Sequence, residues 1–194
     1  SERFDTPFAA VRMAYEYGDL AATKAAFASV GEALTEGGLP ADLAPMVVGF
    51  AGYGNVAQGA MDVFDGLPHV TITPEALLAG ELPKDPTKPL VKVVFAEEHM
   101  VARRDGGAFD LQDYYQRPEG YEGTFARFLP HLDLLLNGIY WEERYPRLVT
   151  RQNLQELWAA PTPPKLRAIG DVSCDIEGSV EVTLKVTMPD APSY

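Results

Sequence analysis

The stretch Met46-Val47-Val48-Gly49-Phe50-Ala51-Gly52-Tyr53-Gly54-Asn55-Val56-Ala57 decides the fold of this chain. It begins with a continuous apolar run, which is typical of a strand buried on both faces of a parallel sheet. The remainder has the form G-x-G-x-x-A and leads into a predicted helix over 55–64. Gly52 permits a tight turn, Gly54 lets backbone approach a pyrophosphate, and Ala57 allows the helix to pack against the strand. Because a helix N-terminus also offers free amide groups, the stretch predicts a dinucleotide-binding turn, with an ordinary glycine turn as the alternative.

Outward from this stretch, the sequence predicts further strands and helices. Residues 69–72 form a β-branched strand, so that strand, helix and second strand make a βαβ unit. The other predicted elements are strands over 90–95, 132–136 and 166–172, a helix from Thr150 to residue 158, and a loop with short helices over 97–123. The fold class is therefore α/β, with a Rossmann-type doubly wound, mostly parallel sheet.

The sequence before this sheet is predicted to be helical. Residues 7–36 are rich in Ala, Leu and Glu, and Thr6 before Pro7 has the pattern of a capped helix start. Gly18-Asp19 breaks this run, so two helices are predicted, and the second ends at Gly37-Gly38. We divide the chain into N-terminal interdomain helices over 1–40 and a Rossmann dinucleotide-binding domain over 41–194. Because the chain starts at Ser1 and enters a helix at once, we expect it to be an excised part of a larger protein.

Composition excludes several classes of partner. The chain has 194 residues, with 16 Lys and Arg against 28 Asp and Glu, which gives a net charge of −12. So acidic a chain is not held to nucleic acid or to an anionic membrane by its own field, and its partners are expected to be small molecules or proteins. The single cysteine, Cys174, excludes a disulfide framework. We expect a buried thiol in a reducing compartment, a cytoplasmic protein and no metal site.

Cofactor choice cannot be assigned from the spacing of acidic residues. About 20 residues beyond the glycine turn, an acidic residue at the end of the second strand would hold the adenine ribose. Thr73 occupies this place, and Glu75 stands two residues later. The cofactor is therefore predicted as NAD or NADP, without a preference.

Two later strands end in polar residues. Asn137-Gly138-Ile139 and Asp171-Val172-Ser173 lie where a Rossmann sheet presents the carboxyl ends of its strands, and Asp175 follows in the crevice where nicotinamide would lie. Asn137 and Asp171 have an alternative interpretation as loop-forming caps. The predicted cofactor-binding residues are Gly52, Tyr53, Gly54, Asn55, Val56, Thr73, Asn137, Gly138, Ile139, Asp171, Val172 and Ser173. Asp175 is predicted to take part in catalysis.

Several blocks of sequence resemble the lysine-ketoglutarate reductase and saccharopine dehydrogenase family. In chain order they are Thr6-Pro7-Phe8, Met13-Ala14-Tyr15, the turn from Gly52 to Gly59, and the stretches 137–142, 146–152 and 171–175. More distantly, the chain is similar to the nucleotide-binding domains of alanine dehydrogenase and the proton-translocating transhydrogenase. Glu97-Glu98-His99 stands where the family has a more basic, histidine-rich stretch.

The resemblance implies an oxidoreductase of lysine metabolism. Its Rossmann domain binds a nicotinamide dinucleotide and faces a companion catalytic domain across a cleft, and hydride is transferred at the imine formed from lysine and 2-oxoglutarate. The family's acid/base lysine and histidine belong to the companion domain outside this chain, so this chain alone is expected to be inactive. Asp175 is carried over as a contributor to the catalytic site. Two alternative functions stay open: an alanine-dehydrogenase-like enzyme domain, and a nucleotide-binding module without catalytic activity. A homo-oligomer is a further possibility that stays open.

Overall fold

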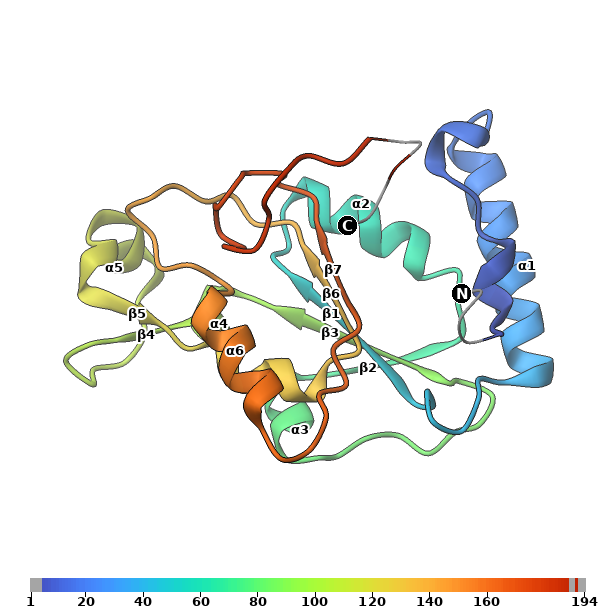
Figure 1. Ribbon diagram of the computed structural model, residues 1–194, viewed down its shortest axis with the longest axis horizontal. Helices are drawn as coiled ribbons and strands as arrows, with labels where there is room; N and C mark the ends of the chain where they lie inside the picture. The colour runs from blue at the N-terminus through green and yellow to red at the C-terminus, as the bar shows by residue number, and fades with distance from the viewer. Residues whose placement is uncertain (1–4, 189–190, 192–194) are drawn as a thin grey trace.

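The chain forms a parallel sheet with helices on both faces (Figure 1). The computed structural model describes residues 5–188 and residue 191. In spatial order, the strands are β2 (His69–Ile72), β3 (Leu90–Phe95), β1 (Met46–Ala51), β6 (Leu134–Asn137) and β7 (Ala168–Asp171). Every neighbouring pair is parallel, which confirms the predicted α/β fold class.

Alternating side chains of the central strand β1 enter two separate cores. Val48 and Phe50 pack with Leu34 and Phe64 on the face that α1 (Leu20–Gly37) and α2 (Asn55–Phe64) cover. The face with Val47 and Ala51 is covered by α3 (Pro74–Leu78), the 3-10 helix η4 (Phe125–His131) and α6 (Arg151–Ala159). β1 is therefore buried on both faces, as its continuous apolar sequence predicts. The assignment of residues 1–40 as interdomain helices stays a prediction.

The order of the strands differs from the simple βαβ unit. The chain does run from β1 through α2 to β2, but β3 lies between these two strands and pairs with both. β2 is short and its side chains are only partly buried, whereas most side chains of β3 are buried. A short, partly exposed strand suits the edge of a sheet, and a longer, mostly buried apolar strand suits its interior. The one charged residue of β3, Lys92, places Nζ 2.5 Å from Asp65 Oδ1.

The N-terminal segment contains less α-helix than its sequence predicts. Residues Pro7–Ala10 (η1) and Ala14–Glu16 (η2) form short 3-10 helices, and the side chain of Thr6 accepts no capping hydrogen bond. Neither turn has a fully buried residue, so packing adds too little to hold an α-helix of this length. The second predicted helix is confirmed as α1, which Asp19 caps by accepting from Ala22 N at 2.8 Å.

Residues 97–123 form more regular structure than the predicted loop. The elements are α4 (Glu97–Met100), β4 (Val101–Arg103), α5 (Leu111–Gln116), the 3-10 helix η3 (Pro118–Gly120) and β5 (Tyr121–Gly123). β4 and β5 pair antiparallel as a small second sheet. Arg103 fixes the connection between them, since it donates to Asp105 at 2.7 and 2.9 Å and to Asp113 at 2.9 Å.

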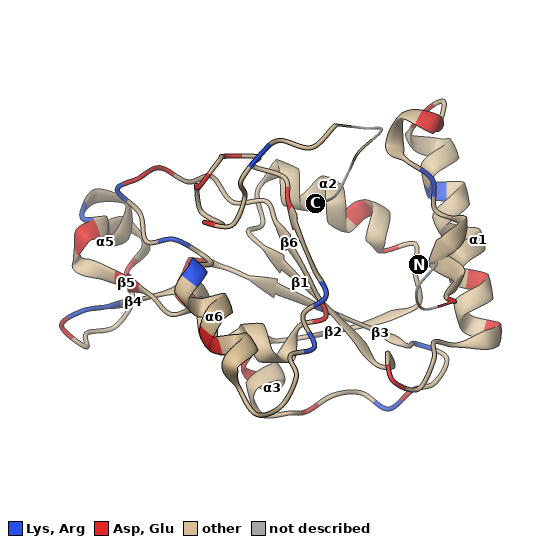
Figure 2. Ribbon diagram, in the orientation of Figure 1, with Lys and Arg blue, Asp and Glu red and all other residues tan. Residues whose placement is uncertain are grey.

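Charged residues lie mainly around the periphery of the fold. Figure 2 shows acidic and basic positions interspersed over the outer helices and loops, whereas β1 and β6 carry no charged residue. Among residues 5–188 and 191, no helix is long and apolar enough to cross a membrane. The same part of the chain contains no group of three His, Cys, Asp or Glu residues that could hold a metal ion.

Candidate functional site

A cavity opens at the carboxyl ends of the central strands. Ala51 at the end of β1 is in register with Phe95 of β3 and with Asn137 of β6, so the loops that follow these strands meet at one edge of the sheet. The cavity measures about 350 Å³, which is at the small end of the range for ligand sites. Its walls are the glycine turn, Glu97, the tyrosines of α5 and the loop over 138–148.

The two glycines of the turn have different roles. Gly52 has φ +95°, and a Cβ there would lie 3.1 Å from Ile139 Cγ2 and 3.3 Å from Gly138 O. Only glycine therefore lets the turn close against the loop after β6. Gly54 has φ −70°, and a Cβ there would meet no atom within 4 Å. The space in front of Gly54 is open, as a pyrophosphate would require.

The start of α2 presents amide groups to this open space. Gly54 is the N-cap residue, and no side chain caps the helix. The first turn therefore keeps free donors and the partial positive charge of a helix N-terminus. Together with the open space at Gly54, this cradle fits a phosphate group. The predicted binding residues Tyr53 and Val56 are about half exposed here, and Asn55 is exposed.

Gly138 and Ile139 lie on the opposite wall of the cavity. A Cβ at Gly138 would stand 3.2 Å from both the amide nitrogen and the Cβ of Ala57. The loop after β6 therefore rests directly on the first turn of α2. This contact between Gly138 and Ala57 brings the two predicted binding segments together.

A carboxylate and two tyrosines form the wall next to the glycine turn. Tyr115 Oη donates to Glu97 Oε1 at 2.7 Å, and a hydrogen bond to Glu97 also raises the pKa of Tyr53. Burial is the main cause of the raised pKa of Tyr115. Both phenols therefore stay protonated at neutral pH and can donate to Glu97. Tyr114, from the same helix, is buried in the core and lines the cavity as well.

Sequence reasoning did not select Glu97. The spacing rule pointed to the end of β2, and the structure brings the end of β3 to the glycine turn instead. The signal that could have found Glu97 is the contrast between the six-residue run Leu90–Phe95, which is apolar except for Lys92, and the four-residue run His69–Ile72, which contains two polar residues. The first run is suited to the strand next to β1, and Glu97 follows it.

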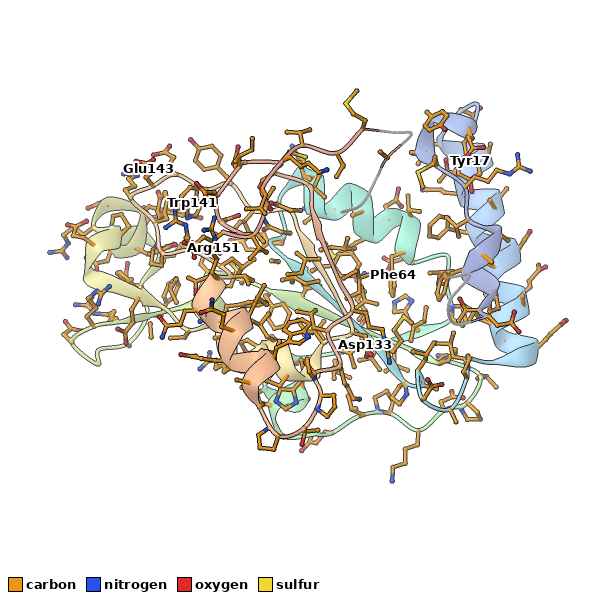
Figure 3. The ribbon with its side chains drawn as sticks, viewed as in Figure 1. Tyr17, Phe64, Asp133, Trp141, Glu143 and Arg151 are labelled. Atoms are coloured by element: carbon orange, nitrogen blue, oxygen red, sulfur yellow. The ribbon has the colours of Figure 1, made fainter. Side chains whose placement is uncertain are left out.

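Arg147 brings a positive charge to the far wall. Its guanidinium lies over the ring of Trp141, 5.4 Å from the centroid, and donates to the carbonyls of Gly178 and Glu177 at 3.1 and 3.0 Å. Trp141 Nε1 in turn donates to Tyr145 O at 3.1 Å. Figure 3 shows Trp141 and Asp133 at opposite ends of the sheet, so this cluster belongs to the carboxyl edge alone.

Asn137 and Asp171 form a hydrogen-bond network beneath the cavity. The fully buried Asn137 donates from Nδ2 to Asp171 Oδ1 and to Ser179 Oγ, at 2.8 Å in each case. Asp171 also accepts from Ser173 Oγ at 2.7 Å and from the hydroxyl of Thr183. The network ties the ends of β6 and β7 to the loop that follows them.

The other predicted site residues do not line the cavity. Thr73 caps α3, where its Oγ1 accepts from Ala76 N at 3.2 Å. Val172 and Asp175 are exposed in the segment after β7, and their roles, like those of Thr73 and Ser173, stay predictions. The expectation of a buried Cys174 thiol is wrong: the residue has φ +56° in a loop that turns to the surface, and its side chain is exposed.

Relatives of this chain among known proteins share one name. No protein-family profile matches the chain. The chain is 38% identical over 205 residues to the alpha-aminoadipic semialdehyde synthase of Arabidopsis thaliana, covering 98% of this chain and 19% of that protein. It is 33% identical over 200 residues to the mitochondrial alpha-aminoadipic semialdehyde synthase of Bos taurus, covering 96% and 22%. The protein of the same name from Rattus norvegicus matches at 33% with the same coverage. The chain thus spans about one fifth of the length of these relatives.

Proposed function

This chain is related to one segment of the lysine-ketoglutarate reductase and saccharopine dehydrogenase family, as its sequence predicts, and from this relationship we propose that it is the dinucleotide-binding part of an oxidoreductase. The proposed cofactor is NAD or NADP. The proposed reaction is hydride transfer at the C–N bond of an imine formed from lysine and 2-oxoglutarate. The companion catalytic domain, which would supply the acid/base lysine and histidine, is part of the proposal, as is a cytoplasmic location.

The observation that carries the proposal is the open helix N-terminus beside the glycine turn. The chain leaves β1 toward β3 and β2 on one side of the sheet and later adds β6 and β7 on the other. Ligands of such sheets bind in the crevice where the direction of strand addition changes, at the carboxyl ends of the strands. Gly52 and Gly138 lie at this point, and the uncapped end of α2 faces the same space.

Each wall of the cavity would have its own task. The amides of residues 53–57 would bind the pyrophosphate, and Arg147 would offset part of its negative charge. Ile139 and the aromatic side chains would exclude water from the ring that exchanges hydride. The bound dinucleotide would accept or donate that hydride. Asn137 and Asp171 would position the loops, and Asp175 would favour positive charge on the substrate or on its acid/base partner.

Replacing Gly54 tests this proposal. The backbone of Gly54 suits any residue and its Cβ direction is empty, so Gly54→Val is expected to lower the free energy of unfolding only by the cost of a poorer N-cap residue, about 1 kcal/mol. The same side chain would stand where the pyrophosphate must approach, and binding of NADH and of NADPH in a calorimetric titration is expected to be abolished.

Gly59→Val is the matched control. Gly59 lies on α2 and is exposed, and a Cβ there also meets no atom within 4 Å. This variant is expected to bind both dinucleotides as the unchanged chain does. Equal affinity in the Gly54→Val variant, with its fold intact, would show that the glycine turn is not the binding site.

A further inference from the structure

The strand order changes which residue lies where a dinucleotide's adenine ribose would be bound. In folds with this glycine turn, the ribose hydroxyls are bound by an acid at the end of the strand that follows the turn and lies beside the first strand. Thr73 has the expected spacing, but it follows β2, which is an edge strand separated from β1 by β3. Glu97 follows β3 about 40 residues beyond the turn, because β2, α3 and a proline-rich loop come first.

The end of β3 is joined directly to the glycine turn. Gly52 N donates to Phe95 O at 2.9 Å, and Glu97 lines the same cavity as Gly52 and Gly54. The side chain of Glu97 is half-buried, with Oε1 accepting from Tyr115 Oη at 2.7 Å. A carboxylate has about four acceptor positions. Glu97 can therefore keep its bond to Tyr115 and still accept from two neighbouring hydroxyl groups.

We propose that Glu97 binds the adenine-ribose hydroxyls of the dinucleotide and thereby selects NAD(H) over NADP(H). The inference rests on the proposed function of the site. NADP(H) carries a phosphate in place of one of these hydroxyls, which removes a donor and brings a negative group to the carboxylate.

The charges around α4 also favour NAD(H) over NADP(H). His99 Nε2 lies 3.4 Å from Glu75 Oε1 and 4.0 Å from Glu98 Oε1, so two further carboxylates stand beside this end of β3. The cation Arg127 is directed to the carbonyl of His99, to which it donates at 3.2 Å. Carboxylates thus outnumber cations at the place where a 2′-phosphate would have to be held.

Titration of the chain with NADH and with NADPH tests the inference. A hydrogen bond to a charged group contributes enough for about a tenfold to hundredfold change in affinity. We expect the unchanged chain to bind NADH at least about tenfold more tightly than NADPH. Glu97→Gln keeps an oxygen for Tyr115 but removes the charge, and it is expected to weaken NADH, strengthen NADPH and bring the two dissociation constants within about threefold.

Two further variants test whether the effect is specific to the carboxylate of Glu97. Glu119→Gln removes the same charge from an exposed side chain that does not line the cavity, and is expected to leave the NADH to NADPH ratio within about threefold of the unchanged chain. Tyr115→Phe removes the hydroxyl group that donates to Glu97 but keeps the Glu97 carboxylate, so the preference for NADH should persist. Thermal melting of each variant verifies that it is folded.

The outcomes distinguish this inference from the function on which it rests. If the unchanged chain binds neither dinucleotide, or if Gly54→Val binds as well as it does, the proposed site is wrong and the inference falls with it. If binding depends on Gly54 but NADPH binds as tightly as NADH, or if Glu97→Gln leaves the ratio unchanged, the site stands and the role of Glu97 is refuted.

Discussion

Replacing Asn137 with alanine is expected to destabilise the fold strongly. Asn137 is fully buried, and its amide group supplies two hydrogen bonds of 2.8 Å, one to the Asp171 carboxylate and one to Ser179 Oγ. Hydrogen bonds to charged groups contribute about 1.5–3 kcal/mol, and leaving a buried hydroxyl without its donor adds about 1 kcal/mol. The free energy of unfolding should therefore fall by about 3 kcal/mol. At about 2–4 °C per kcal/mol for a chain of this size, the melting temperature should fall by about 6–12 °C.

Urea unfolding followed by circular dichroism and by tryptophan fluorescence measures this change. Ser173→Ala is the matched control, because it removes one hydrogen bond to the same Asp171 oxygen from a half-buried position and should cost about 1 kcal/mol. If Asn137→Ala costs no more than Ser173→Ala, the network does not hold β6 and β7 together. Asn137 would then not be the residue that positions the cavity loops.

Two other predictions concern carboxylates. Burial raises the pKa of Asp133, whose carboxylate accepts from Val47 N at 2.9 Å. Between pH about 4 and the pKa of Asp133 in the folded state, the native protein therefore binds more protons than the unfolded chain. Over this range the free energy of unfolding falls as pH rises. Asp133→Asn keeps an acceptor for Val47 without that titration, and urea midpoints from pH 4 to 7 should show the unchanged chain losing stability relative to the variant; a constant difference would contradict this. In the intact enzyme of which we propose this chain is a part, Asp175→Asn should lower kcat well beyond any change in dinucleotide affinity. Earlier melting with an unchanged kcat would mark Asp175 as a loop residue.

The elements with a strong local pattern were predictable from the sequence. The apolar run of β1 and the glycine turn specify a strand, a turn and a helix over consecutive residues, and the structure has them at the predicted bounds. Thr150 was predicted to cap α6, and its Oγ1 does accept from Asn153 N at 3.1 Å. In these places the information lies within a few neighbouring residues.

Contacts between distant segments were not predictable in the same way. The strand order depends on how β2 and β3 compete for the place beside β1, which no local spacing encodes. β4 and β5 have three residues each, too few to show an alternating pattern. The role of Asn137 in cofactor binding stays a prediction, whereas its bond to Ser179, 42 positions away, has no sequence signal. The bond between them becomes visible only when the chain is folded.

The place of β3 in the sheet also affects how the chain acquires its structure during synthesis. β1 and β2 are made first, but each finds its hydrogen-bonding partner only when residues 90–95 have emerged. During that interval their edges are open templates for pairing with other chains. α1 and α2 can cover one face of β1 by then, and β2, with four residues, is too short to be a good template. The strand order that brings Glu97 to the glycine turn therefore has a second consequence. In the nascent chain, β1 and β2 can first become part of one sheet when β3 is complete.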